Sequence, residues 1–551
     1  VLPEDVVFHA DVGDLVHALS NQLIRINRCP TTQEGTPPQG SFHLRKVSLR
    51  GSLITNTVRN GHIMYADGKL WIAKAENKIH LLPKYANRHG LIAGASGTGK
   101  TVTIKVMAES FSAMGVPVFM ADIKGDVGGL CRAGKDSESM RKRISSLGVD
   151  GFDYTGYPCE FWDIYGEKGH PVRTTLESMG TDLLSRLMGM SEVQEDVLRM
   201  VFRICEDEGW RLVDTKDLRA AVSFISDHRK DYEDEYGSLN PQSMSVIQRS
   251  VMALEDIGGD MFFGEPALDI YDWMSTAPDG RGMINILSGV KLARNPELYS
   301  TFMIWLMEEL FDVLPEVGDL DKPKLVFFFD EAHMLFSDSS PALTKKVEQT
   351  VKLIRSKGVG IYFISQSPSD IPDGVLAQLS NRIQHALRAY TPKEQKAVRA
   401  AAETFRSNPG FKTAEAIMEL GTGEALVSFL DERGSPSVVE RAMILPPQSF
   451  LGAISDDDYR VMTESSALDV KYRDRLDAET AYEELTEIKE AKAKEAAKAV
   501  KEESKKKTSA SPRTRKTKSR TEKTVDRAIG NAASAIGRGI GNKISKRLFG
   551  R

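Results

Sequence analysis

The chain has 551 residues, with 41% hydrophobic and 27% charged residues and a formal net charge of −4. This composition is typical of a water-soluble globular protein with about two to four domains, and no apolar run approaches the roughly 18 residues of a membrane span. Residues 501–551 contain 16 Lys and Arg against 4 Asp and Glu, so they carry +12 and residues 1–500 carry −16. The acidic body argues against a wholly basic nucleic-acid-binding domain but leaves room for a basic tail or channel.

The four cysteines lie far apart in the sequence and include no CxxC pair; they are Cys29, Cys131, Cys159 and Cys205. Such spacing indicates neither a disulfide framework nor a zinc site, and it is typical of reduced thiols. The sequence also does not open with a signal-peptide pattern. We therefore expect a cytoplasmic protein.

The first part of the chain, residues 1–68, predicts a leader that is β-rich or partly disordered. Residues 69–82 contain KLWIAKA and NKIHLL, two short apolar segments that predict a β-hairpin. This hairpin leads into the segment on which the rest of the interpretation depends.

Residues 89–103 read HGLIAGASGTGKTVT, which predicts a buried strand, a glycine-rich loop and a helix. That order is the context of a P-loop, whose expected members are Gly94, Ala95, Ser96, Gly97, Thr98, Gly99, Lys100 and Thr101. The glycines allow backbone N–H groups to surround a phosphate, and the helix N-terminus adds about half a positive charge. We expect Lys100 to reach the β- and γ-phosphates of ATP and Thr101 to hold Mg²⁺.

A second buried strand is predicted at residues 116–121, before the polar segment that contains Asp122, Lys124 and Asp126. Strand, helix and strand within about 35 residues form a βαβ unit, which predicts a parallel sheet. The three charged residues then lie at the carboxyl end of a strand, where open α/β sheets bind ligands. A polar turn that simply leaves the sheet explains them equally well.

Residues 136–275 predict an insertion that is mixed at first and then all-α. Between 176 and about 257 the apolar residues recur at helical spacing, which indicates four or five helices with a shared core rather than a cofactor site. The α/β pattern resumes at residues 282–287.

Residues 324–333 read KLVFFFDEAH, an apolar strand that ends in two adjacent acids. We expect Asp330 to position Mg²⁺ and Glu331 to orient the attacking water or take its proton. The letters from Asp330 to His333 also spell the signature of a different helicase superfamily. The second-domain motif of those helicases is absent downstream, so we interpret His333 as incidental.

A third buried strand at residues 359–366 ends in Gln366, which is placed to sense the γ-phosphate. An acidic strand followed by a polar-ended strand is typical of RecA-like motors and not of nucleotide kinases or GTPases. Arg355, Arg382 and Arg388 flank this region. Any one of them is a candidate arginine finger that stabilises transition-state charge across a subunit boundary, although a surface or structural role is the commoner one for a single arginine.

After a last core strand at residues 424–429, the composition changes and apolar residues become sparse. The expected organisation is a leader (1–68), a RecA-like core (69–135 and 276–450), an insertion (136–275), a helical extension (451–503), a basic disordered linker (504–523) and a basic amphipathic helix (524–551). The final helix, weakened by four glycines, could contact DNA, an anionic membrane surface or a groove on a partner. The sequence does not choose among the three.

Five segments in this order resemble the bacterial HerA-like ATPases of the HerA/FtsK branch: GASGTGKT at 94–101, ADIKGDVGGL at 121–130, GHPVRTT at 169–175, FFFDEAHMLF at 327–336 and ISQSP at 364–368. The resemblance covers about residues 70–450. It implies a RecA-like core, a homo-hexameric ring, ATP hydrolysis between subunits and often DNA translocation. The residues that carry over are Lys100, Thr101, Asp330, Glu331 and Gln366, with a weaker match for Arg355 or Arg382 as the finger.

The sequence thus predicts an α/β fold with a RecA-like P-loop NTPase core, a mainly parallel sheet, an all-α insertion, a small N-terminal β-rich segment and a helical or disordered tail. The expected function is a ring-forming, Mg²⁺-dependent ATPase that moves or remodels double-stranded DNA. One alternative is an ATP-driven assembly scaffold that activates a partner nuclease or other effector protein. Another is a phosphotransferase, which is disfavoured because Glu331 points to activation of water.

Overall fold

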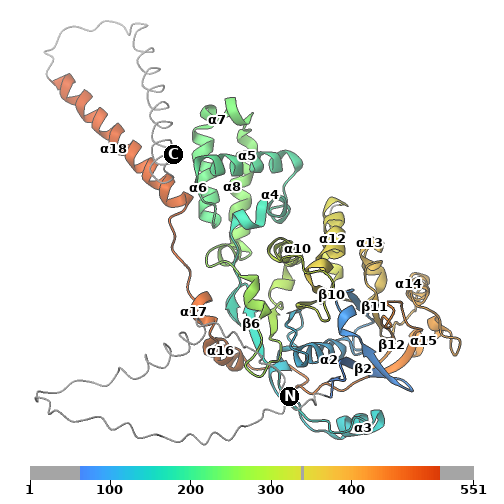
Figure 1. The fold of residues 1–551 in the computed structure, drawn as a ribbon. Coiled ribbons are helices and arrows are strands. Elements are labelled where there is room, and N and C mark those ends of the chain that lie inside the picture. Colours follow the sequence, from blue (N-terminus) through green and yellow to red (C-terminus); the bar gives the residue numbers. More distant parts are fainter. Residues whose placement is uncertain (1–62, 337–340, 509–551) are drawn as a thin grey trace, which may run out of the picture. The chain divides into compact units, whose positions relative to one another are not determined.

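The computed structural model describes residues 63–336 and 341–508. Within these residues, thirteen strands form one sheet, most of which lies in the lower right part of Figure 1. The strands are β1 (Tyr65–Ala66), β2 (Lys69–Lys74), β3 (Lys78–Leu81), β4 (Gly90–Ala93), β5 (Val118–Asp122), β6 (Cys159–Asp163), β7 (His170–Pro171), β8 (Ile284–Ser288), β9 (Leu325–Phe329), β10 (Val359–Ser365), β11 (Asn381–Gln384), β12 (Glu424–Ser428) and β13 (Glu440–Ile444).

The order of strands across the sheet is β1-β2-β13-β12-β11-β4-β10-β9-β5-β8-β6-β7, with β3 paired to β2. From β11 to β7 every pairing is parallel, whereas β1, β2, β3, β12 and β13 pair antiparallel. The expected mainly parallel sheet is confirmed. The β2–β3 hairpin predicted at residues 69–82 is also present and forms part of the antiparallel flank.

The helices are α2 (Lys100–Ala113), α3 (Glu138–Leu147), α4 (Leu176–Leu187), α5 (Glu192–Glu208), α6 (Thr215–Asp227), α7 (Arg229–Tyr236), α8 (Pro241–Asp256), α9 (Gly259–Phe262), α10 (Pro296–Val313), α11 (His333–Phe336), α12 (Pro341–Ile354), α13 (Asp373–Leu376), α14 (Pro392–Glu403), α15 (Thr413–Glu419), α16 (Asp456–Ser465), α17 (Asp469–Tyr472) and α18 (Ala481–Thr508). Among these helices, none combines the length and the apolar character needed to cross a membrane.

The central parallel strands β4, β5, β9 and β10 are buried on both faces, which explains why they are nearly continuous apolar runs in the sequence. Alternate residues of β9 enter two separate hydrophobic clusters. Phe327 and Phe329 pack in the cluster that contains α10, and Val326 and Phe328 pack in the cluster that contains α2. Because neighbouring side chains of a strand point to opposite faces, one run of phenylalanines fixes helices on both sides of the sheet.

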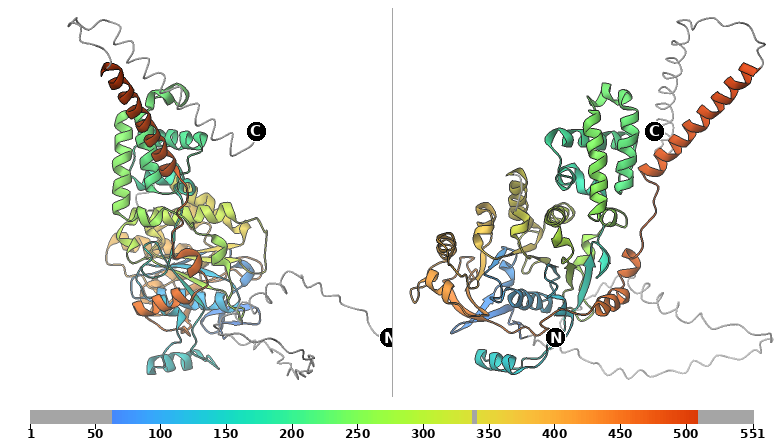
Figure 2. Two further views of the ribbon diagram at one scale, coloured as in Figure 1. Left: turned by 90° about the vertical axis from the view of Figure 1, so that its left-hand side faces the viewer. Right: turned by 180° about the vertical axis from the view of Figure 1, so that it is seen from behind.

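The predicted all-α insertion is present, and residues 176–256 form the five helices α4 to α8, drawn in green in Figures 1 and 2. Their apolar stripes are buried core, as expected; Leu183, Val197 and Leu218 are each less than 4% exposed. The structure differs from the expected boundary at residue 136, because β6 and β7 are strands of the central sheet. The pairing of β6 with β8 joins segments more than 100 residues apart, and local sequence patterns do not report such a pairing.

The C-terminal part of the described chain is helical. Leu485 of α18 is fully buried in the cluster that contains the insertion helices. The helix continues to Thr508, so the linker predicted to be disordered from residue 504 is wrong for residues 504–508. Residues 504–508 read SKKKT, and lysine extends a helix that has already formed at little cost. The leader before residue 63, the linker after 508 and the predicted basic helix at 524–551 lie outside the described residues.

Candidate active site

The P-loop connects the end of β4 to the start of α2, as the sequence predicts. Gly97 and Gly99 adopt φ of 75° and 117°, in the left-handed region where a side chain is strained. Gly99 is the N-cap of α2 and supplies no side chain to cap the helix. The first N–H groups of α2 are therefore available to an anion, which the helix dipole also favours.

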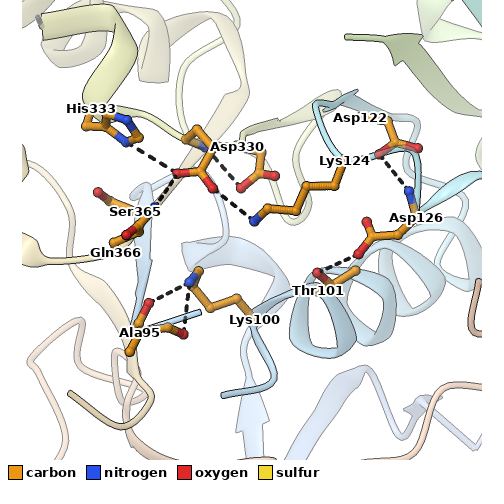
Figure 3. Close-up of polar contacts among 12 residues, drawn as sticks. Ala95, Lys100, Thr101, Asp122, Lys124, Asp126, Asp330, His333, Ser365 and Gln366 are labelled. Carbon is orange, nitrogen blue, oxygen red and sulfur yellow. Dashed lines mark hydrogen bonds and ion pairs between the residues drawn. The ribbon is translucent and has the colours of Figure 1, made fainter. Parts of the chain in front are cut away.

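The Lys100 side chain folds back over this loop and is 6% exposed. Its Nζ donates hydrogen bonds to the carbonyl oxygens of Gly94 at 2.5 Å and Ala95 at 3.2 Å (Figure 3). Burial and the nearby Lys124 ammonium lower the pKa of Lys100, while Glu331 and Asp330 oppose that shift. The lysine and the two acids thus share one electrostatic environment, although they are separated by some 230 positions in the sequence.

The two acids follow β9, which lies one strand away from β4, with β10 between them. The Glu331 N–H donates to Oδ1 of Asp330 at 2.9 Å, and the buried Tyr299 hydroxyl donates to the Asp330 carbonyl at 2.8 Å. Burial raises the pKa of Asp330 to about 6, although Lys124 lowers it. Glu331 has a φ of 49°, a conformation that costs a non-glycine residue about 1–3 kcal/mol and that clusters at functional sites.

The Glu331 carboxylate contacts three side chains from three different segments (Figure 3). Lys124 Nζ lies 2.9 Å from Oε1, while Gln366 Nε2 at 3.4 Å and His333 Nδ1 at 3.3 Å both contact Oε2. Burial alone would raise the pKa of Glu331, but the hydrogen bond and charge of Lys124 outweigh it and the pKa is lowered. Gln366, predicted to sense the γ-phosphate, therefore lies at the site. His333, which the sequence interpretation treats as incidental, contacts Glu331 from two positions along the same segment.

The loop after β5 belongs to the same site. The Asp122 carboxylate accepts hydrogen bonds from the N–H groups of Gly125, Asp126 and Val127 at 2.7, 3.0 and 3.1 Å. The next carboxylate, that of Asp126, accepts a hydrogen bond from the Thr101 hydroxyl at 3.3 Å. Asp122 thus holds the turn that follows β5, whereas Lys124 and Asp126 contact Glu331 and Thr101 of the predicted nucleotide site. A ligand at this edge of the sheet stays a prediction.

Behind the P-loop lies a buried residue that sequence reasoning missed. The His385 ring contacts the Thr103 hydroxyl through Nε2 and the Glu424 carbonyl through Nδ1, both at 2.9 Å. Because a carbonyl can only accept, Nδ1 carries the proton and Nε2 accepts from the hydroxyl. Burial lowers the pKa of His385 to about 4, so the ring is neutral near pH 7. A Cβ added at Gly94 would lie 2.5 Å from the Cβ of His385, so the close approach of His385 also explains that glycine.

The three candidate arginines make their contacts away from this group of residues. Arg355 lies in the short helix η5 (Arg355–Lys357), which precedes β10, and pairs with Asp319 at 3.4 Å. It is therefore at the amino ends of the parallel strands, whereas the P-loop follows the carboxyl end of β4. Arg382 donates to the carbonyl oxygens of Leu376 and Leu379, both at 3.0 Å, and burial lowers its pKa. Arg388 donates to the carbonyl oxygens at the end of α15 and just after it. A finger role across a subunit boundary remains a prediction.

The residues at the site fit a magnesium nucleotide. The Thr101 hydroxyl and the Asp330 carboxylate are hard oxygen ligands of the kind that Mg²⁺ prefers, and P-loop sites complete the metal shell with phosphates and water. The uncapped N-terminus of α2 and the Lys100 ammonium supply donors for phosphate oxygens. Figure 3 shows Lys100, Thr101, Lys124 and Asp330 gathered at the ends of β4, β5 and β9.

Comparison with known proteins agrees with this geometry. Residues 69–550 match the family model described as the helicase HerA-like C-terminal region. The chain belongs to this family. It is therefore a P-loop NTPase of the HerA type, as the ordered motifs in the sequence suggest.

Curated relatives of this HerA-like chain include the DNA double-strand break repair helicase HerA of Saccharolobus solfataricus, 23% identical over 346 residues, which are 62% of this chain and 61% of the relative. The protein of the same name from Sulfolobus acidocaldarius is 28% identical over 130 residues, 23% of this chain and 24% of the relative. The chain thus matches less than two thirds of the length of these relatives.

Among solved structures, the HerA-like chain is similar to the bacterial conjugative coupling protein TrwB, with 15% identity and a TM-score of 0.47 over 69% of this chain and 89% of TrwB. The structure of VirB4 of Thermoanaerobacter pseudethanolicus gives 14% identity and a TM-score of 0.43 over 69% of this chain and 97% of VirB4.

Proposed function

We propose that this HerA-like chain hydrolyses ATP in the presence of Mg²⁺. The observation that supports this most strongly is the meeting, within one subunit, of the Lys100 loop with Asp330 and Glu331. In this proposal Lys100 and the α2 N–H groups bind the phosphates, and Thr101 and Asp330 hold the metal. Glu331 acts on the attacking water, and Gln366 senses the γ-phosphate.

The environment of Glu331 suits a base that acts on water. Its side chain is 9% exposed, yet its pKa is lowered, so the carboxylate is ionised near pH 7 and able to accept a hydrogen bond from water. The neighbouring Asp330 has the opposite shift, a pKa raised by burial, and would be neutralised by the Mg²⁺ charge once metal is bound. The two adjacent acids therefore have different properties that match their proposed roles.

We further propose that the chain forms a homo-hexameric ring and couples hydrolysis to the movement of double-stranded DNA. Support comes from membership in a helicase family and from curated relatives that are named DNA double-strand break repair helicases. A ring would allow Arg355 or Arg382 to reach the nucleotide of a neighbouring subunit. Because the relatives are matched over only part of their length, DNA, the ring and any partner protein are proposals for this chain.

The test is the steady-state ATPase rate, measured with and without linear double-stranded DNA on protein whose oligomeric state is known from light scattering. We expect DNA to raise the rate several-fold, and the stimulation to fall steeply between about 50 and 200 mM salt, because phosphate contacts release counterions. The variant Lys100→Ala should show no hydrolysis with or without DNA. A wild-type rate that is indifferent to DNA would contradict the motor and favour an ATP-driven scaffold that activates a partner protein.

A further inference from the structure

The ion pair between Lys124 and Glu331 has no place in the roles proposed above, yet it involves the residue that acts on water. The Lys124 side chain, 42% exposed, extends from the loop after β5 to the end of β9 and places its ammonium 2.9 Å from Oε1 of Glu331. The other oxygen, Oε2, is contacted by Gln366 and His333. Both oxygens of the proposed base are therefore engaged by hydrogen-bond donors or a cation.

The Lys124 ammonium takes up one of the directions from which a water molecule could donate a hydrogen bond to Oε1 of Glu331. While the ion pair is closed, less of that oxygen is open to the attacking water. Because a base must lie within hydrogen-bond reach of the proton that it takes, withdrawal of the ammonium would open Oε1 to water.

The backbone around this ion pair is held in place on both sides. Asp122 binds three successive N–H groups of the Lys124 loop, which fixes the path of the loop from 122 to 127. Glu331 is kept at a positive φ that its own side chain disfavours. The geometry is thus imposed by the fold on two segments 207 positions apart and does not arise from a chance meeting of surface charges.

The same loop is linked to the metal-binding side of the site. Asp126, two residues after Lys124, accepts the hydrogen bond of the Thr101 hydroxyl. A cation that binds the oxygen of that hydroxyl would polarise its O–H bond and strengthen the hydrogen bond to Asp126, and so would act on the loop that carries Lys124. The position of Lys124 is therefore connected to what is bound at Thr101.

We propose that Lys124 is a positioning residue that restrains Glu331 in a resting arrangement, and that this ion pair must open before Glu331 can act on water. This inference rests on the proposed ATPase function. In this proposal the loop at 122–127 couples what is bound at Thr101 to whether Glu331 is free to contact water.

The test compares Lys124→Met, which removes the charge and keeps the apolar stem, with Lys124→Arg, which keeps the charge. We expect Lys124→Met to raise kcat by about threefold or more, while the Kd of a fluorescent ATP analogue changes by less than about twofold. Lys124→Arg should return the rate to near the wild-type value. The control is Lys291→Ala, because Lys291 makes an ion pair of 2.6 Å with the largely exposed Glu167 and its removal should leave both values unchanged.

A second measurement needs neither nucleotide nor activity. In nucleotide-free protein, thermal unfolding midpoints are measured for Lys124→Met, Glu331→Gln and the double variant. If the two side chains interact, the shift caused by Lys124→Met in the wild-type background should largely disappear in the Glu331→Gln background. Additive shifts would overturn the ion pair itself.

Three kinetic outcomes would overturn the restraint. A kcat reduced by about tenfold in Lys124→Met would mean that Lys124 assists the transition state, and a Kd raised by about tenfold would mean that it binds phosphate. An unchanged kcat and Kd would show that the ion pair does not limit Glu331. If the wild-type protein itself lacks ATPase activity, the proposed function fails, and the unfolding measurement still decides whether Lys124 and Glu331 interact.

Discussion

The Thr103 hydroxyl in the first turn of α2 lies 2.9 Å from Nε2 of His385, a fully buried histidine that follows β11. The other ring nitrogen donates to the carbonyl of Glu424, where β12 begins. One neutral imidazole thus connects the phosphate-binding helix to the antiparallel part of the sheet. His385, which belongs to none of the sequence motifs, thus holds the helix that follows the P-loop against the sheet.

This arrangement predicts a specific pH dependence of stability. The pKa of His385 is lowered to about 4 in the folded chain, against an ordinary value of 6.5, so only the unfolded chain binds a proton between these values. The stabilisation is therefore complete above pH 6.5 and is lost as the pH falls toward 4. We expect the wild type to lose about 2 kcal/mol more than His385→Gln between pH 7 and pH 5, measured by urea denaturation. Equal losses in the two proteins would mean that His385 is not the buried neutral group described here.

Removal of the proposed phosphate-binding lysine, Lys100, should weaken the binding of ATP. Lys100→Ala deletes a charged donor at the base of the site, and hydrogen bonds to charged groups contribute roughly 1.5–3 kcal/mol, so the Kd for ATP should rise about 10- to 100-fold. The measurement is equilibrium titration with a fluorescent nucleotide. As a control, Lys142→Ala removes an exposed lysine of α3 that pairs with Glu138, and it should bind nucleotide like the wild type. An unchanged affinity of Lys100→Ala for ATP would show that Lys100 does not bind the phosphates.

Substitution of Arg382 and of Arg355 should lower the free energy of unfolding by different amounts. Arg382 donates to two backbone carbonyls, so we expect Arg382→Ala to lower the free energy of unfolding by about 1–3 kcal/mol. Arg355 makes an ion pair with a largely exposed partner, so Arg355→Ala should change stability by less than about 1 kcal/mol. Chemical denaturation of both variants checks this difference. A larger loss for Arg355→Ala would show that it is the structural residue.

Subunit mixing tests whether Arg355 acts in trans. In a ring, Arg355→Ala and Glu331→Gln should each be nearly inactive, because a finger contributes about 10³-fold or more to phosphoryl transfer. A mixture of the two contains interfaces in which an intact Arg355 faces an intact Glu331, so activity should reappear after the subunits are mixed. Arg382→Ala in place of Arg355→Ala is the matched comparison. If neither mixture regains activity, neither arginine acts across the boundary.

Much of the site could be predicted from the sequence because its parts are encoded locally. Glycine spacing and apolar runs specify a strand, a loop and a helix at residues 90–113, and a run of phenylalanines before Asp330 and Glu331 specifies a buried strand. The contact of Lys124 with Glu331 was not predicted, because it depends on β5 and β9 being neighbours in the sheet. His385 was missed for a related reason: the short sequence around it is ordinary, and its contacts with Thr103 and Glu424 depend on the order of the strands.

Local sequence patterns also predict only part of the fold. The insertion helices α4 to α8 follow from apolar periodicity, with capping residues such as Thr175 and Asp214 at their starts. The membership of β6 in the main sheet depends on β8, which returns only after those helices. Periodicity within a segment therefore predicts its type, whereas its place in the sheet is decided by partners far along the chain.

The most direct test of the site as a whole is the rate of ATP turnover by Glu331→Gln in Mg²⁺, with nucleotide binding confirmed on the same sample. Glutamine keeps the size of the side chain but cannot take a proton from water. Our account predicts binding within about twofold of the wild type and a turnover reduced by about 10²- to 10⁴-fold. Turnover at the wild-type rate would contradict it, because the strand that ends in Asp330 and Glu331 would then not supply the base that acts on water beside Lys100.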